Sequence, residues 1–391
     1  MGRFDHFEKE LEHLRNADLY RQLRLIDSAQ GTVVRIDGQE KILFCSNNYL
    51  GLACDERVIE AVIRAVKEYG HGAAASRLIS GNMRPHSELE DRFARLLGKE
   101  AALIFPSGWM ANEGVIKTLP QKGDLILLDK LDHASIVDAA KASDADFRTY
   151  RRGQYDRLEK YLADDDYQNK FIVTESIFSM DGDAADLREL VDLKKKHDAF
   201  LIVDEAHALG CFGKNGAGLA EETGVLDEVD IIVGTMSKAM GSAGGFVAGK
   251  KVIIDYLINR ARSFIYTTSP TVANCAAAMA ALDIIEAEPH RRERLRLNAE
   301  YVRSKLRDMG LNIGQSCSNI IPVIMGNEKN TIDTSNRLYE KGFYVAAIRP
   351  PTVAPGTSRL RLSIQSEHCM EQLEKLCGAF EELISEGVLS S

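Results

Sequence analysis

Helical and strand-like hydrophobic patterns alternate along the middle of the chain. Apolar side chains at helical spacing predict a helix over 58–69 that stops at Gly70. Ser87 and Glu90 have the spacing of a capping box and predict the start of a second helix, which Gly98 would end. Short continuous apolar runs follow at 101–105, 124–128, 171–174, 200–203, 230–233 and 246–248. Such runs predict the buried strands of a mostly parallel sheet with helices on both faces.

The pattern changes after about residue 285. A highly charged helix over 288–306 leads into a strand-rich tail and a last amphipathic helix over 370–383. We therefore predict a large α/β domain over 45–285. The N-terminal segment 1–44 and the C-terminal segment 286–391 would together form a smaller domain.

Composition and charge exclude several classes of function. The 391 residues are 45% hydrophobic, which is ample for a large core, and 58 acidic residues outnumber 49 basic ones to give a net charge of -9. A nucleic-acid partner usually requires the opposite balance. The first residues, MGRFDHFEKELEHLR, are too charged for a signal peptide, and no apolar run is long enough to span a membrane. The seven cysteines lack metal-ligand spacing, so we expect no metal site and a cytoplasmic protein.

Candidate chemistry lies where two predicted strands end. The strand in LIVDEAHALG runs directly into Asp204 and His207, and the strand in DIIVGTMSK delivers Lys238 before a run of glycines. Ligands of parallel sheets bind at the carboxyl ends of the strands. Neighbouring strand ends would therefore present a carboxylate, an imidazole and an amine to one pocket.

These three groups together suit pyridoxal 5'-phosphate (PLP). A carboxylate keeps the pyridine nitrogen protonated, a lysine amine forms a Schiff base with the aldehyde, and an imidazole can bind the ring hydroxyl. Taken alone, Asp204 could equally be a structural carboxylate, and Lys238 would most simply be a solvated lysine. Only the combination favours the cofactor.

Two other motifs in this region point to nucleotide hydrolysis and can be rejected. Asp204 to His207 spell the DEAH box of helicases, and residues 244–250 nearly form a P-loop. The P-loop needs Ser or Thr at the next position, which is Lys251, and the near-match follows the acidic motif instead of preceding it.

Eight segments carry a resemblance to a known family. They are SNNYLGL (46–52), ASRLISGN (75–82), SGWMAN (107–112), LDHASIVD (131–138), TESIFSMDGD (174–183), VDEAHALG (203–210), GTMSKAMGSAGG (234–245) and RPPTVAPGTSRLRLS (349–363). In this order they resemble the α-oxoamine synthases. The resemblance implies the α/β fold of fold type I PLP-dependent transferases, with a mostly parallel seven-stranded sheet and a smaller α/β domain. It also implies a homodimer whose site lies at the subunit interface.

The same resemblance assigns roles at the cofactor. Lys238 would carry the Schiff base, Asp204 would pair with the pyridine nitrogen, His207 would bind the phenolic oxygen, and His133 would stack on the ring and act in catalysis. Further cofactor contacts would come from Gly108, Trp109, Ser179, Thr235 and, from a partner subunit, Thr268. Gly108 and Trp109 follow a strand and open a helix, so their backbone N–H groups could hold a phosphate.

The resemblance also implies residues that would bind the substrates, most of them near the two ends of the chain. Arg361 would grip the amino-acid carboxylate, with Arg359 as the second candidate, because a guanidinium binds a carboxylate bidentately. Asn47 would lie near that carboxylate, while Arg21 and Thr352 would contact the acyl substrate. For Arg21 a solvated helix face is the alternative.

The implied reaction condenses an amino acid with an acyl thioester, on coenzyme A or a carrier protein, and releases carbon dioxide. RPPTV, GTSRLR and SRLISGN are typical of the branch that joins L-alanine to a pimeloyl thioester. Residues 353–356 (VAPG) and Trp109 depart from that branch, so branches that use glycine or serine stay open. An aminotransferase of the same fold would share Lys238 and Asp204, whereas a non-catalytic subunit would lack the lysine.

Overall fold

The computed structural model describes residues 2–389 and divides the chain into two compact units. Unit 1 contains the residues up to Tyr49, the short stretch Met180–Gly182 and the residues from Arg294 on. Unit 2 contains Leu50–Ser179 and Asp183–Glu293. The sequence-based division falls after residues 44 and 285 and does not include the short stretch.

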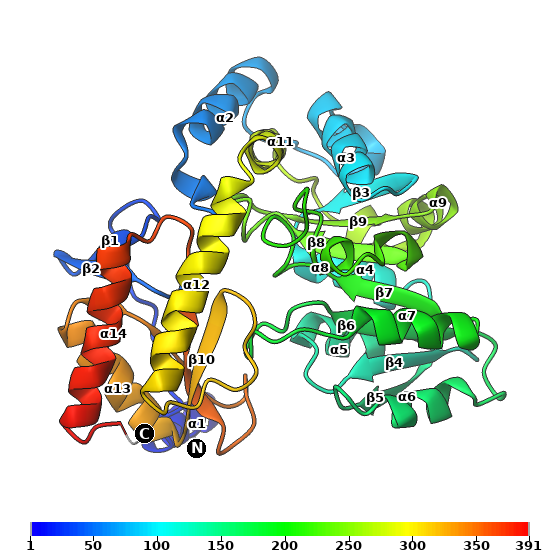
Figure 1. Cartoon of the computed structure of the whole chain (residues 1–391). Helices are drawn as coiled ribbons and strands as arrows, with labels where there is room; N and C mark the ends of the chain where they lie inside the picture. The colour runs from blue at the N-terminus through cyan, green and yellow to red at the C-terminus, as the bar shows by residue number, and fades with distance from the viewer. Residues whose placement is uncertain (1, 390–391) are drawn as a thin grey trace. The chain divides into compact units, whose positions relative to one another are not determined.

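A single seven-stranded sheet organises unit 2 (Figure 1), in the order β3-β9-β8-β7-β6-β4-β5. The strands are β3 (Ala101–Phe105), β4 (Leu125–Asp129), β5 (Asp146–Tyr150), β6 (Lys170–Glu175), β7 (Phe200–Asp204), β8 (Ile231–Thr235) and β9 (Gly245–Gly249). β9 runs antiparallel to both of its neighbours, and the other neighbouring strands are parallel. The predicted mostly parallel sheet is confirmed, with β5 as a strand that the hydrophobic pattern did not indicate.

Helices cover both faces of this sheet. Alternate strand residues share a buried core with α4 (Gly108–Ile116), α5 (Ala134–Lys141), α9 (Lys251–Arg260) and α10 (Arg262–Ile265). The other face meets α3 (Arg84–Leu96) and α7 (Leu187–Lys196). There Phe93 of α3 stacks on Phe246 of β9, with 3.9 Å between ring centroids. The remaining helices of this unit are α2 (Glu56–Tyr69), α6 (Tyr155–Leu162), α8 (Leu219–Glu222) and α11 (Val272–Ala287).

The predicted start of α3 was wrong by one turn. The helix begins at Arg84, and Ser87 lies inside its first turn. Pro85 suits the start of a helix because its missing N–H would have no helical partner there. The His86 ring nitrogen Nδ1 accepts a hydrogen bond from the Met83 N–H at 3.1 Å and takes the role that the predicted capping box gave to Glu90. The predicted end of α2 is confirmed, since Gly70 has a φ of 80°.

A network of charged side chains joins the first and the last residues of unit 2. Arg291 donates to the Leu50 carbonyl at 2.9 Å and pairs with Asp55 at 3.0 Å. Arg57 bridges Asp55 and Glu288 at 2.8 and 2.5 Å. Hydrogen bonds from Arg57 and then Arg291 lower the pKa of Glu288 to about 2, so this network stays charged at neutral pH.

The described residues of unit 1 form two small sheets and four helices. One sheet joins β1 (Val33–Ile36), β2 (Gln39–Leu43) and β11 (Phe343–Tyr344), and the other joins β10 (Ile320–Gly326), β13 (Ser358–Ser363) and β12 (Ala346–Ile348). The helices are α1 (Asp5–Asn16), α12 (His290–Asp308, of which the first four residues belong to unit 2), α13 (Glu328–Glu340) and α14 (Met370–Ser385). Figure 1 shows α12, α14 and β10 side by side, and their apolar side chains share one buried core.

Gly182 lies in the short stretch that belongs to unit 1 and cannot carry a side chain. Its φ is +67°, and a Cβ would lie 1.9 Å from the Ile320 carbonyl oxygen. We expect Gly182→Ala to lower the free energy of unfolding by at least about 3 kcal/mol, because the backbone must move apart. Gly387→Ala is the matched control, since its φ is +71° and nothing lies within 4 Å of the added atom. Urea unfolding should show a loss of about 1 kcal/mol for the control. Equal losses in the two variants would contradict the clash.

Candidate active site

The carboxyl ends of three neighbouring parallel strands converge in unit 2. β7 ends at Asp204, β8 at Thr235 and β6 at Glu175. Lys238 follows β8 in the tight connection to antiparallel β9, in which Thr235 pairs with Gly245. Because parallel strands end at the same edge of a sheet, these side chains share one region, as the sequence predicts.

Lys238 and His207 are in direct contact. The lysine Nζ and the His207 Nε2 are 2.8 Å apart. His207 is buried, whereas Lys238 is half-buried. One proton can therefore be shared between an amine and an imidazole, which is the arrangement of a nucleophile beside a base.

Asp204 is a buried carboxylate held at both oxygens. It is 6% exposed, and its Oδ1 accepts from the Ala206 N–H at 2.8 Å. Its Oδ2 accepts from Asn112 Nδ2 of α4, also at 2.8 Å, and the same amide donates to Ser135 of α5 at 3.0 Å. The carboxylate is thus held directly by α4 and, through the Asn112 amide, linked to α5. The Oδ1 atom of Asn112 is buried, and the described residues give it no hydrogen-bond partner.

His133 precedes α5 and points toward Trp109 at the start of α4. Its Nδ1 lies 2.8 Å from the Ser135 hydroxyl and accepts from the Ser135 N–H at 3.2 Å. The His133 and Trp109 rings meet edge to face, with centroids 5.9 Å apart. Loss of water around the imidazole lowers the pKa of His133; the charge of Asp204 opposes the shift, and Lys238 favours it. His133 is therefore neutral at physiological pH.

The N-terminus of α4 and the end of β8 form an anion-binding arrangement. α4 begins at Gly108, after Ser107 caps the Met110 N–H at 3.2 Å. A Cβ on Gly108 would lie 3.3 Å from the Cβ of Thr235, so the helix start and this threonine are neighbours. The Thr235 hydroxyl is 2.8 Å from that of Ser237. Free N–H groups at a helix start and adjacent hydroxyls suit a phosphate.

Two further predicted cofactor residues also lie in unit 2. Ser179 is buried in the turn after β6. Thr268 is exposed after α10, and within residues 2–389 no hydrogen bond joins it to the side chains above. Its role in a partner subunit stays a prediction.

The predicted substrate residues all lie in unit 1, and two of them belong to one network. Arg361 is 6% exposed; it donates to Ser363 Oγ at 2.6 Å and to the Tyr49 hydroxyl at 3.4 Å. That hydroxyl donates to Asn47 Oδ1 at 3.1 Å. Arg359 instead pairs with Asp181 at 2.5 Å. This favours Arg361 over Arg359 for binding a carboxylate.

Arg21 lines a separate cavity of about 650 Å³ in unit 1 that is rich in guanidinium groups. Arg15, Arg24 and Arg349 line it too, with Asp18 as the acidic residue in the lining. Arg21 donates to the Pro350 carbonyl at 3.1 Å. Burial and the nearby Arg21 charge lower the pKa of Arg349, so an anion in this cavity would relieve repulsion. Thr352 is exposed and donates through its N–H to the Arg349 carbonyl at 3.1 Å.

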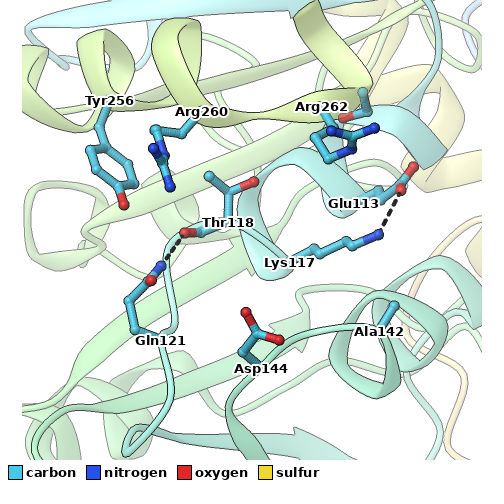
Figure 2. Close-up of a pocket in the computed structure, with 10 residues that line it drawn as sticks. Glu113, Lys117, Thr118, Gln121, Ala142, Asp144, Tyr256, Arg260 and Arg262 are labelled. Carbon is cyan, nitrogen blue, oxygen red and sulfur yellow. Dashed lines mark hydrogen bonds and ion pairs between the residues drawn. The ribbon is translucent and has the colours of Figure 1, made fainter. Parts of the chain in front are cut away.

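Another cavity of unit 2, of about 220 Å³, contains none of the predicted site residues (Figure 2). Lys117, Arg260 and Arg262 extend toward it, and Lys117 lies 3.9 Å from Glu113. Lys117 and Arg260 lie at the C-terminal ends of α4 and α9. These cations offset the negative ends of the helix dipoles, which accounts for them without a ligand.

Sequence patterns alone could not identify Asn112, Ser135, Ser237 or Glu175 as members of this site. Each is a common residue type whose importance depends on contacts between different elements. No cluster of histidine, cysteine or acidic residues in the described part of the chain could hold a metal ion. Nor does that part contain a helix of the length and apolarity needed to cross a membrane.

Comparison with known proteins decides the family. The model of the family "Aminotransferase class I and II" matches residues 39–380. The chain belongs to the class I and II aminotransferase family. Within this family, 8-amino-7-oxononanoate synthase 2 of Bacillus subtilis is 43% identical over 376 residues, which are 96% of each chain. The α-oxoamine synthase resemblance is thereby confirmed.

Solved structures agree with this assignment. The serine palmitoyltransferase of Sphingomonas wittichii has a TM-score of 0.93 and 35% identity, covering 100% of this chain and 99% of that chain. A serine palmitoyltransferase variant from S. paucimobilis, with a bound PLP–myriocin aldimine, has a TM-score of 0.93 and 32% identity, covering 99% and 98%. The fold is that of fold type I transferases.

Proposed function

We propose that this α-oxoamine synthase uses PLP to condense an amino acid with an acyl thioester, with loss of carbon dioxide. The observation that carries the proposal is the contact between Lys238 and His207, beside the fixed carboxylate of Asp204. The PLP named for the S. paucimobilis relative supports the choice of cofactor.

The residues present fit PLP by their chemistry. Asp204 supplies a negative charge for the pyridine nitrogen, His207 a ring nitrogen for the phenolic oxygen, and Lys238 an amine for the aldehyde. The start of α4 with Thr235 suits the phosphate. The buried, unpartnered Oδ1 of Asn112 next to Asp204 also indicates that a polar group belongs there.

Bound PLP supplies a protonated ring that withdraws electrons from the α-carbon of an attached amino acid. Asp204, held by two donors, keeps the negative charge that this ring needs. Lys238 Nζ would remove the α-proton, and the adjacent His207 Nε2 helps to keep that amine available as a base. His133, neutral and flanked by Trp109, would cover the ring face. Arg361 would fix the amino-acid carboxylate.

We propose L-alanine and a pimeloyl thioester as substrates, giving 8-amino-7-oxononanoate for biotin synthesis. The name of the Bacillus subtilis relative and the segments RPPTV and GTSRLR support this choice. The guanidinium groups around Arg21 suit a donor that carries an anion. The serine palmitoyltransferase neighbours keep a serine-using reaction as the second candidate, beside the glycine-using 2-amino-3-ketobutyrate ligase and 5-aminolevulinate synthase.

A thiol-release screen tests the proposal. Glycine, alanine and serine are each offered with acetyl, succinyl, pimeloyl and palmitoyl thioesters, on coenzyme A and on a carrier protein. We expect the fastest release of free thiol with alanine and the pimeloyl donor. An aminotransferase would instead transfer an amino group to a keto acid without releasing thiol, and that result would overturn the proposal.

We also propose a cytoplasmic homodimer. Large apolar side chains are exposed on unit 2, with Leu78 at 51%, Ile79 at 82% and Tyr266 at 72%. A second copy of the chain would cover exposed apolar side chains of this size. Light scattering should give twice the 43.3 kDa mass of one chain; a monomer in dilute solution would contradict the dimer.

A further inference from the structure

Glu175 is a buried carboxyl group at the end of β6 that the proposed mechanism does not use. It is 2% exposed. In the parallel pair of β6 and β7 it lies opposite Asp204. Because side chains alternate between the two faces of a sheet, paired residues point to the same face, so both carboxyl groups face the region of the active site.

Glu175 connects the end of β6 to the segment that carries His133. The His133 backbone N–H faces its carboxyl group and, acting as a donor to it, lowers the pKa of Glu175. Its own N–H donates to Asp132 Oδ1 at 3.0 Å, and the other oxygen of Asp132 accepts from the Asp129 N–H at 2.9 Å. The side chain of Asp132, directly before His133, is therefore tied to the end of β6, and the carboxyl group of Glu175 lies next to the His133 backbone.

The second carboxyl oxygen of Glu175 has no partner. Oε2 is buried, and no hydrogen bond reaches it from any residue that the structure describes. An ionised carboxylate without compensating donors is costly in such a place. Asp204, by contrast, receives two hydrogen bonds of 2.8 Å each. When two buried carboxyl groups face each other, the one that accepts more hydrogen bonds ionises, and the other keeps its proton.

The charges around Glu175 also favour a protonated Glu175 beside an ionised Asp204. Burial and then Asp204 raise the pKa of Glu175 to about 8, against the opposing effects of Lys238, the His133 N–H and Arg152. Asp132 cannot serve as a counterion for an ionised Glu175, because a carboxyl group carries no positive charge; burial and then the nearby Glu175 and Asp129 raise the pKa of Asp132 itself well above the usual range.

We propose that Glu175 is a positioning residue. As a neutral acid it anchors the backbone of His133 and leaves the negative charge of the site on Asp204. This inference rests on the proposed function, in which Asp204 and His133 contact the cofactor.

Substitutions at this position separate anchoring from charge. Glu175→Ala removes the acceptor for the His133 N–H; we expect kcat to fall at least about tenfold with little change in KM. The pH midpoint of the visible absorbance of the PLP-loaded protein should shift by at least about 0.5 units. Glu175→Gln keeps a neutral acceptor of the same size and should restore most of both losses. Glu113→Gln, on the surface of α4, is the control.

Thermal unfolding of the full chain gives a second measurement that does not depend on activity. A carboxyl whose pKa is higher in the folded than in the unfolded protein stabilises the fold most at low pH, and this stability is lost as pH rises from about 4.3 through about 8. Glutamine does not titrate. The Tm of the Glu175→Gln variant minus that of the native protein should therefore rise by about 3 °C between pH 5 and pH 9.

The outcomes are distinct. A Tm difference that stays constant or falls with pH would show that Glu175 is ionised in the fold and would overturn its neutral state. An Ala substitution without effect on kcat and on the absorbance midpoint would overturn its positioning role. If the native protein shows no visible PLP absorbance, the proposed function itself fails, while the unfolding comparison still reports on Glu175.

Discussion

Replacing Lys238 by alanine is expected to remove the visible absorbance of the PLP-loaded protein and to lower kcat by at least about a thousandfold. The amine is both the attachment point for the aldehyde and the base that removes the α-proton. His207 Nε2, which is 2.8 Å from Nζ, loses this contact in the variant. Absorbance after dialysis and thiol release measure the two effects separately.

Lys250→Ala is the matched control for this experiment. Lys250 is exposed and follows the far end of β9, at the start of α9. Its replacement should leave both the absorbance and the rate within about twofold of the native values. A Lys238→Ala protein that keeps its visible absorbance through dialysis and still releases thiol from its substrates would contradict the proposed mechanism.

Asp204→Asn should lower kcat by about a hundredfold or more, while the protein still folds. The new amide has nearly the shape of the carboxylate, and rotation of the Asn112 amide would turn the unpartnered Oδ1 toward it. The backbone N–H of Ala206 keeps an oxygen acceptor. The loss is therefore one of charge, because a neutral side chain cannot hold the proton on the pyridine nitrogen.

The control for this variant is Asp198→Asn, before the opposite end of the same strand. Asp198 is exposed, so the change of charge there should not alter kcat. Single-turnover rates and the Tm of each variant distinguish lost chemistry from lost folding. Equal kcat values for Asp204→Asn and the native protein would show that the carboxylate does not serve the cofactor.

The central sheet and part of the site could be predicted because they follow from local patterns. Short apolar runs give β6, β7 and β8, and the rule that parallel strands end at one edge brings Asp204, His207 and Lys238 together. β5 escaped prediction because its sequence, DFRTY, has four residues that are not buried and no apolar run. Its pairing with β4 makes it a strand, and only the assembled sheet provides that.

Contacts between helices and strands that are distant in the chain could not be predicted from the sequence. Asn112 lies within a helix whose pattern only shows that it is buried, and nothing local indicates that its amide reaches both Asp204 and Ser135. Ser87 shows the reverse case. Its spacing to Glu90 fits a capping box, but Pro85 and His86 already begin the helix. Local rules compete, and the tertiary structure decides between them.

The hydrogen bond between Arg291 and the Leu50 carbonyl also bears on how the protein folds. These residues are 241 positions apart, and joining the ends of so long a flexible loop costs about 5 kcal/mol in chain entropy. Once unit 2 has folded, that cost has been met, and its two chain exits are held next to each other. β2 and β11, which pair in unit 1, are then separated by 59 residues of chain outside the closed loop (43 to 50 and 291 to 343) instead of 300 (43 to 343). We therefore expect unit 2 to form first during synthesis and the discontinuous unit to assemble on completion of the chain.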